Sequence, residues 1–327
     1  MWRHDLTIEY EMTPSGRLIL DQGSQDAVIA MDPWSRHHAY HLICRDKYRE
    51  TAGAVDPQPE TDMAKNGFQV LPGLLTADQV SQVRAMMDDR IGGREERPVK
   101  FEDWAQPLPW NMARIHSVRQ VLASAFDGPL SQVIEAYFES YFRLLSVTVT
   151  RAHPAPAKNS FLWHRDIEPP QQTHLMIYLT DSSPETGGTS FLNLADSRIS
   201  AENGYSFKNF EERSASLESI EQKAGKSFEV HRPALKAGDG VLFAAPRILH
   251  RGELPTKGVR DAITVLMLPS PVPWQEFLAG SPGRVFVTEH PASAFIEPFG
   301  DGMLEKTGML TPPNWASLGE FFPPDSP

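Results

Sequence analysis

The chain has 327 residues, with 31 Lys and Arg side chains against 42 Asp and Glu, which gives a formal net charge of −11 at pH 7. A net negative field repels phosphate backbones and no run rich in Lys and Arg offsets it, so we expect neither nucleic acid nor a membrane as a partner. No apolar run of about 18 residues predicts a spanning helix. With a single cysteine, Cys44, and no apolar signal-peptide stretch at the start, a cytoplasmic protein is expected.

Residues 1–62 are expected to form an N-terminal extension made of a hairpin and a linker. Two half-alternating runs, 7–12 and 17–20, flank the turn sequence Thr-Pro-Ser-Gly at 13–16. Two prolines among acidic and small residues favour a linker over 51–62.

Helical signals follow the extension. Thr76 and Gln79 have the spacing of a capping box, apolar side chains recur at helical spacing after them, and Gly92 ends the pattern. A second helix is predicted to start near Ser117 and a third over 131–138. Together they predict a helical layer that precedes the strands.

From residue 143 onward the apolar period changes from helical to two. Helices first and many short strands afterwards favour a β-sandwich or barrel flanked by helices over alternating βαβ units. The polar, aperiodic stretch 196–226 predicts an insertion or a lid. Strands are expected over residues 144–151, 174–180, 189–194, 240–244 and 262–268.

The strongest chemical signal is the H-x-D pattern within 163–166. On an extended segment, residues two apart point to the same side, so His164 and Asp166 present an imidazole and a carboxylate together. His250 follows far along the chain. Two imidazoles and one carboxylate on one face of a metal leave three positions open, which is the facial triad of non-haem Fe(II) oxygenases. Arg260, ten residues after His250, is suited to clamp a carboxylate through two parallel hydrogen bonds.

In this combination the chain resembles the Fe(II)/2-oxoglutarate-dependent dioxygenases over residues 63–270. The resemblance also includes the opening segment 66–75, the run 177–180 and Gly187-Gly188-Thr189. It implies a mainly β fold with flanking helices: a double-stranded β-helix, the jelly-roll or cupin-like barrel, behind an N-terminal helical layer. Residues 271–327 would be a C-terminal extension that packs on the barrel.

Two branches of that superfamily share features with this chain. Tyr178-Leu179, the glycine pair at 187–188 and the run around Arg260 look most like the prolyl-4-hydroxylase-like branch. The opening segment also resembles the phytanoyl-CoA hydroxylase branch. That branch often has a serine two residues after the arginine, where this chain has Ala262, so the first branch is preferred.

The resemblance assigns metal ligands residue by residue. His164, Asp166 and His250 would bind Fe(II), and with Arg260 they would form the catalytic group.

It also assigns the cosubstrate pocket. Arg260 would pair with the distal carboxylate of 2-oxoglutarate, and Tyr178 would donate a hydrogen bond to it. Thr264, four residues after Arg260 and on the same face of its strand, would line the pocket. His153 stands where the preferred branch often places a tyrosine that contacts the cosubstrate.

The resemblance implies an oxygenase that uses O₂ to hydroxylate an unactivated C–H bond of an amino acid, a peptide or a small metabolite, and that releases succinate and CO₂. Desaturation or cyclisation can arise from the same chemistry. Two alternatives stay open: a cupin-like metalloenzyme that does not use 2-oxoglutarate, and a non-catalytic barrel that binds a small molecule. The expected partner is a small-molecule or peptide substrate, and the oligomeric state is left open.

Overall fold

The computed structural model describes residues 8–14, 16, 18–31, 33–52, 61–91, 105–166 and 170–277. Most of the expected linker over 51–62, Gly92 and the C-terminal extension from residue 278 lie outside the described residues. No helix within these ranges is long and apolar enough to cross a membrane.

Six antiparallel strands form the major sheet, in the order β3-β8-β6-β10-β5-β4. In β10, Thr264 lies opposite Thr148 of β5 on one side and Met176 of β6 on the other. The bounds are β3 Phe68–Leu71, β4 Ala105–Pro107, β5 Tyr141–Ala152, β6 Thr173–Tyr178, β8 Gly240–Phe243 and β10 Arg260–Ser270.

A smaller sheet faces the major one. It pairs β7 (Gly188–Phe191) with β9 (His250–Glu253) and is widened by single bridges, His164 to His250 and Phe191 to His231. With the segments at 164 and 231 counted as strands, the chain from β5 to β10 supplies four strands to each sheet. This is the arrangement of a jelly roll, so the expected double-stranded β-helix is confirmed.

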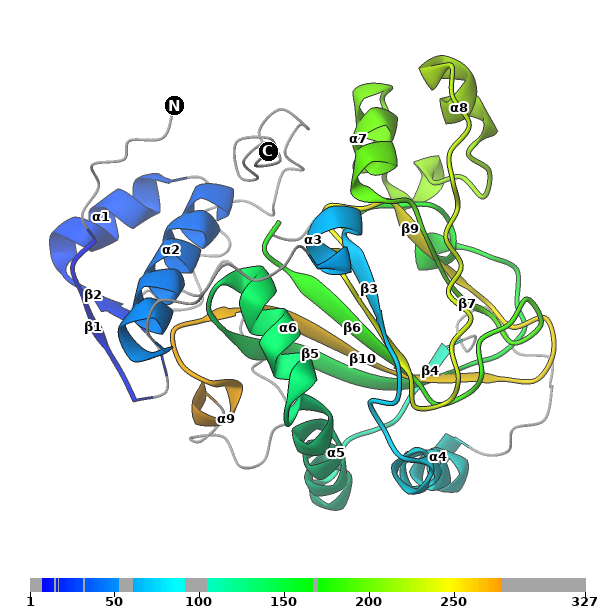
Figure 1. Cartoon of the computed structure of the whole chain (residues 1–327), viewed down its shortest axis with the longest axis horizontal. Coiled ribbons are helices and arrows are strands. Elements are labelled where there is room, and N and C mark those ends of the chain that lie inside the picture. The colour runs from blue at the N-terminus through cyan, green and yellow to red at the C-terminus, as the bar shows by residue number, and fades with distance from the viewer. Residues whose placement is uncertain are drawn as a thin grey trace.

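Three helices cover the outer face of the major sheet: α4 (Ala77–Ile91), α5 (Met112–Phe126) and α6 (Pro129–Phe138) (Figure 1). Ile263 and Val265 of β10 point toward these helices and belong to the same apolar core. Because successive strand residues alternate in direction, Ala262 and Thr264 point the other way, toward the smaller sheet. The two β10 residues predicted to line the pocket, Arg260 and Thr264, therefore lie on the face that points toward the barrel interior.

Helix capping decides where two of these helices begin. The capping box of α4 is present: Gln79 N donates to Thr76 Oγ1 at 3.3 Å, and Thr76 N donates to Gln79 Oε1 at 2.9 Å. The prediction that the next helix starts near Ser117 is wrong. Helix α5 starts at Met112, because Asn111 Oδ1 accepts a hydrogen bond from Arg114 N at 2.9 Å and is the better cap.

Residues 8–52 contain the expected hairpin together with two helices that the sequence analysis did not predict. Helix α2 joins this unit to α6: Tyr48 Oη donates to Glu135 Oε2 at 3.1 Å, and His41 Nε2 donates to Phe138 O at 2.6 Å. The division of the chain into three parts stays a prediction. The bounds are β1 Tyr10–Met12, β2 Leu18–Leu20, α1 Gln22–Ala30 and α2 Pro33–Ala52.

The insertion expected over 196–226 is present between β7 and β8 and lies on the side of the molecule away from α1 and α2 (Figure 1). It contains two helices that its polar composition concealed, and its apolar residues surround Trp163. Tyr205 Oη donates to Trp163 O and accepts from Ser214 N, both at 2.8 Å. The insertion is thus fastened to the residue that precedes His164. Its helices are α7 Leu194–Glu202 and α8 Glu218–Ala224; the other short elements are α3 Asp62–Asn66, α9 Trp274–Phe277 and 3₁₀ turns at Asn159–Phe161 and Phe210–Glu212.

A buried ion-pair network fastens α4 to the major sheet. Arg151 Nε and Nη2 donate to the two carboxylate oxygens of Asp261 at 2.8 Å each, and both side chains are fully buried. From α4, Arg84 Nε donates to Asp261 Oδ2 at 3.0 Å, and Asp88 Oδ1 lies 2.8 Å from Arg151 Nη2. Such bidentate, charge-assisted bonds fix the relative position of α4, β5 and β10.

Replacing Arg151 by Met is expected to destabilise the protein by about 3–5 kcal/mol, because it leaves the Asp261 carboxylate buried with fewer partners. Urea unfolding followed by circular dichroism measures this change. The matched control is Arg198→Met, which removes an exposed pair with Glu202 (3.0 Å) and should cost no more than about 0.5 kcal/mol. Equal stability of the two variants would contradict the importance of the network.

Candidate active site

Backbone pairing holds the two predicted histidine ligands side by side. His164 N donates to His250 O and His250 N donates to His164 O, both at 2.9 Å. Residues paired in this way have Cα atoms about 5.5 Å apart and side chains on the same face. The imidazole centroids are accordingly 4.3 Å apart. Asp166, two residues after His164, is fixed by its own backbone bond to Ala245 O at 3.2 Å.

The three predicted ligands converge. Asp166 Oδ1 lies 3.3 Å from His164 Nε2, and Asp166 Oδ2 lies 4.0 Å from His250 Nε2. One ligand atom from each residue falls within 4.8 Å of the others, and the described part of the chain contains no other such group of three. Adjacent ligands about 2.1 Å from one octahedral ion are about 3 Å apart. The pair of Asp166 and His164 already has this spacing, and His250 has to move closer for all three to share one divalent metal.

The protonation of the three ligands also suits a metal. His164 Nδ1 donates to Leu162 O at 2.8 Å and His250 Nδ1 donates to Ile248 O at 3.1 Å, which leaves both Nε2 lone pairs for an ion. Burial is the main cause that lowers the pKa of His250 to about 3. Burial raises the pKa of Asp166, but the adjacent rings of His164, His250 and His174 lower it by more, so the pKa lies well below its usual range. Asp166 is thus a carboxylate at neutral pH.

Arg260 is fixed at the start of β10 and is almost fully buried. Its Nη1 donates to Gly188 O at 2.7 Å and to Glu253 O at 2.8 Å, and the guanidinium lies 5.4 Å from the centre of the Phe161 ring. Gly252 makes room for that ring, since a Cβ there would lie 2.9 Å from Phe161 Cε1. Arg260 Nε is buried and has no hydrogen-bond partner within the described residues. The arginine is rigid, with donor capacity left for a ligand.

The smaller sheet connects Arg260 to the candidate metal ligands. Glu253, whose carbonyl accepts from Arg260, is three residues along β9 from His250. At about 3.3 Å per residue, this corresponds to about 10 Å of strand. The two ends of the site are thus joined by one short strand.

Tyr178 and Thr264 lie on the interior wall between these ends. Tyr178 is fully buried, and its Oη is 2.8 Å from Thr189 Oγ1 of the smaller sheet. Thr264 is half-buried and lies opposite Met176, whose Sδ is 3.5 Å from Thr189 Oγ1. The hydroxyl of Thr189 is a site residue that the sequence analysis did not single out.

His153 lies at the same end of the barrel as Arg260. It directly follows Ala152, which pairs with Arg260, and it is fully buried. Its role in cosubstrate binding stays a prediction.

The structure places a second residue that was not predicted, His174, beside the candidate ligand Asp166. Its Nε2 lies 3.5 Å from Asp166 Oδ2 and 3.0 Å from Gln172 Nε2. The alternation of β6 placed His174 on the same face as Tyr178. Its proximity to Asp166 depends on how the two sheets pack, which the strand period does not encode.

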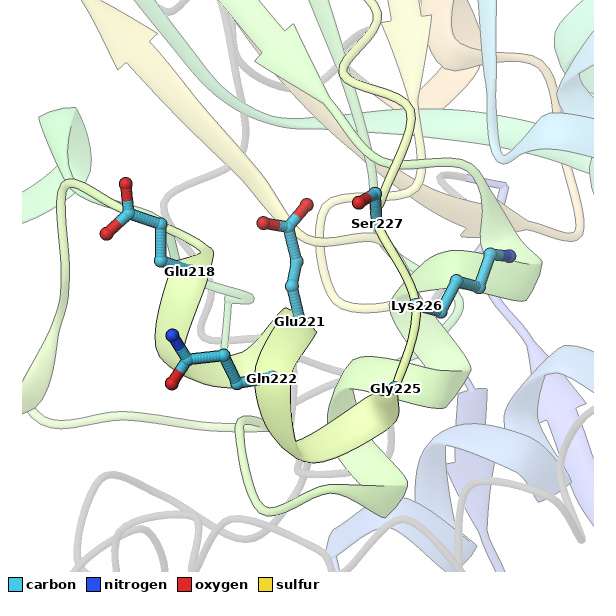
Figure 2. Close-up of a pocket in the computed structure, with 6 residues that line it drawn as sticks. All are labelled: Glu218, Glu221, Gln222, Gly225, Lys226 and Ser227. Atoms are coloured by element: carbon cyan, nitrogen blue, oxygen red, sulfur yellow. The ribbon is translucent and has the colours of Figure 1, made fainter.

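A separate polar hollow of about 410 Å³ lies at the outer end of the insertion (Figure 2). Two of its charged side chains have structural partners: Glu221 Oε1 accepts from Phe228 N at 2.8 Å, and Lys226 Nζ donates to Asp196 Oδ1 at 2.5 Å. Figure 2 shows Lys226 extending away from Glu221. We therefore place the function in the barrel. The hollow is lined by Glu218, Glu221, Gln222, Gly225, Lys226 and Ser227.

No protein-family model and no curated protein matches the chain. Among solved structures, the chain is similar to the non-heme alpha ketoglutarate dependent carbocyclase SnoK from nogalamycin biosynthesis, with 20% identity over 73% of this chain and 96% of SnoK, at a TM-score of 0.47. It is also similar to the non-heme alpha ketoglutarate dependent epimerase SnoN from nogalamycin biosynthesis, with 16% identity over 71% of this chain and 83% of SnoN, at a TM-score of 0.43. A third similar structure is EctD from S. alaskensis, with 15% identity over 63% of this chain and 74% of EctD, at a TM-score of 0.44. These likenesses are too distant to assign a reaction, and the preference for the prolyl-4-hydroxylase-like branch stays a prediction.

If the three converging residues bind a metal, Asp166→Ala removes one ligand and should weaken metal binding by more than the 10–100-fold that loss of an outer hydrogen bond typically costs. Calorimetric titration of Co(II) into metal-free protein measures the affinity. Asp181→Ala is the control, because Asp181 bonds Lys236 Nζ at 2.9 Å outside the site. Unchanged Co(II) affinity in Asp166→Ala would exclude this group as the metal site.

Proposed function

We propose that the protein is a non-haem Fe(II)- and 2-oxoglutarate-dependent oxygenase that hydroxylates a C–H bond of an amino acid, a peptide or a small metabolite. One observation carries the proposal. Two histidines and one carboxylate converge inside the barrel, and the same interior wall carries, at its other end, a buried arginine whose Nε has no partner among the described residues. His164, Asp166 and His250 would hold the iron, and Arg260 would bind the distal carboxylate of 2-oxoglutarate.

The residues at the far end of the wall suit a carboxylate. Burial lowers the pKa of the Arg260 guanidinium, while nearby Tyr178 and Glu253 raise it. A cation removed from water in this way gains from an anion that reaches it. The hydroxyls of Tyr178 and Thr189 lie 2.8 Å apart, and Thr189 Oγ1 also donates to Met176 Sδ at 3.5 Å. Because a thioether sulfur is a weak acceptor, an anion that reaches this wall competes with it for a hydroxyl proton.

The length of the site also suits a short diacid. About 10 Å of strand separates the carbonyl partner of Arg260 from the metal-binding end. A five-carbon chain has four C–C bonds of about 1.5 Å, and a metal–oxygen contact at one end and a hydrogen bond at the other supply the remaining reach. A diacid that binds metal at one end and arginine at the other therefore matches the wall.

Fe(II) together with 2-oxoglutarate and O₂ supplies the oxidising power, with succinate and CO₂ as products. The side chains of this protein bind and orient. His164, Asp166 and His250 would hold the metal from one side and leave its other side open to the cosubstrate, and the paired backbones of His164 and His250 fix two of these ligands relative to each other. Arg260 sets the direction of the diacid, and the buried wall excludes water from the reacting atoms. Thr264 and His153 are assigned to the pocket wall by the same proposal.

An anaerobic titration tests the cofactor assignment. Adding Fe(II) and 2-oxoglutarate together to metal-free protein is expected to give a weak visible charge-transfer band that neither gives alone. No band, and no 2-oxoglutarate binding by calorimetry, would favour the cupin-like metalloenzyme or the binding barrel instead.

The Arg260→Met variant tests the proposed clamp. Loss of one partner of a buried charge pair costs about 2–5 kcal/mol, so the affinity for 2-oxoglutarate should fall by about 30-fold or more while Fe(II) still binds. Titration of 2-oxoglutarate into Fe(II)-loaded protein, followed by the band, measures this fall. Arg232→Met is the control, since Arg232 pairs with Glu253 on the exposed side at 3.0 Å. Equal 2-oxoglutarate affinity in the two variants would remove Arg260 from the pocket.

A further inference from the structure

Phe161 lies just before the segment that carries the first candidate metal ligand. It is the last residue of the 3₁₀ turn Asn159–Phe161, three residues before His164, and only 5% of it is exposed. Phe161 N donates to Lys158 O at 2.9 Å, and Asn159 adopts the left-handed region with a φ of 52°. Asparagine tolerates this region better than most residues do. The turn therefore gives the Phe161 side chain a fixed direction.

The segment from Phe161 to His164 runs beside β9 in the opposite direction. His164 pairs with His250 at the start of β9, and Phe161 lies against Gly252 two residues further along. Because residues two apart on a strand share a face, a side chain at position 252 would point the same way as that of His250. The Phe161 ring takes this space: a Cβ on Gly252 would lie 2.9 Å from Phe161 Cε1 and 3.0 Å from Cδ1. The ring therefore lies on the interior face of β9.

The Arg260 guanidinium is held at one nitrogen and covered on one face. Both of its main-chain hydrogen bonds come from Nη1, and the acceptors, Gly188 O and Glu253 O, belong to paired residues of β7 and β9. Because the guanidinium is a planar fork, these bonds leave the edge formed by Nε and Nη2 for a carboxylate. Two bonds from one nitrogen still allow the plane to tilt about that nitrogen. The Phe161 ring, 5.4 Å from the guanidinium carbon, opposes this tilt.

Burial strengthens the contact between the ring and the cation. A guanidinium within about 6 Å of an aromatic face is attracted to it, and the attraction grows where water is excluded. Both side chains are buried. Glu253 offers Arg260 its main-chain carbonyl, while its carboxylate accepts from Ser190 Oγ at 2.7 Å and pairs with Arg232 at 3.0 Å. The aromatic face is thus a substantial part of what holds Arg260 in place.

We propose that Phe161 is a positioning residue of the cosubstrate pocket, whose ring holds the Arg260 guanidinium with its Nε–Nη2 edge toward the distal carboxylate of 2-oxoglutarate. The inference rests on the proposed function. Gly252 provides the space that the ring needs. Phe161 acts through Arg260, so its effect on 2-oxoglutarate binding disappears when the guanidinium is removed.

Anaerobic titration of 2-oxoglutarate into Fe(II)-loaded protein, followed by the charge-transfer band, tests the proposal. Phe161→Leu keeps an apolar side chain but removes the aromatic face, and it should weaken 2-oxoglutarate binding by about 10-fold, the size of a desolvated cation–π contact. Co(II) affinity should stay at the wild-type value, because the backbone pairing of His164 and His250 is kept. Phe210→Leu is the matched control, since Phe210 is exposed and its ring lies 4.6 Å from the Arg213 guanidinium.

A double-mutant cycle separates positioning from simple packing. Added to Arg260→Met, Phe161→Leu should cause no further loss of 2-oxoglutarate affinity. The same loss in both backgrounds would make Phe161 a packing residue and overturn the proposal, as would wild-type affinity in Phe161→Leu alone. Failure of the wild type to bind 2-oxoglutarate would instead contradict the proposed function on which the inference rests.

Gly252→Ala provides a second test should Phe161→Leu not fold. The added Cβ displaces the Phe161 ring without changing its chemistry. Weaker 2-oxoglutarate binding with unchanged Co(II) affinity is expected, and 2-oxoglutarate affinity equal to that of the wild type would overturn the proposal.

Discussion

The site depends on the pair of backbone hydrogen bonds between His164 and His250. Two segments far apart in the sequence are fixed at strand distance by this pair, and both imidazoles emerge on one face. Each ring then donates from Nδ1 to a carbonyl two residues before it. The two paired segments therefore also orient the imidazole rings. The relative position of the two histidine side chains is set mainly by these local hydrogen bonds.

That pairing is short, and the insertion compensates for its shortness. His164 makes a single bridge rather than part of a long strand, but Trp163 next to it is held at both ends of its peptide, by Ser214 and by Tyr205. A segment whose polar composition predicted an insertion or a lid is thus part of the support of the segment that carries His164. Changes in its core are expected to reach the ligands through Trp163.

Local patterns in the sequence predicted those features that local forces determine. The capping box at Thr76 and the period of β10, which put Thr264 on the face of Arg260, are of this kind. The places of His174 and Thr189 were not predicted, because they depend on the distance between two sheets and on which side chains meet across it. The start of α5 was missed because Asn111, a cap outside the apolar pattern, was overlooked.

Consecutive residues of β10 serve opposite faces of the major sheet. Arg260 points inward to the proposed cosubstrate, while Asp261 points outward into the ion pairs with Arg151 and Arg84. Because the start of β10 is bonded on both faces of the sheet, it has little freedom to tilt. The ion pairs on the outer face therefore also fix the position of Arg260 in the interior. Substitutions at Arg84 on α4 are therefore expected to shift Arg260 through Asp261, although Arg84 itself lies outside the pocket.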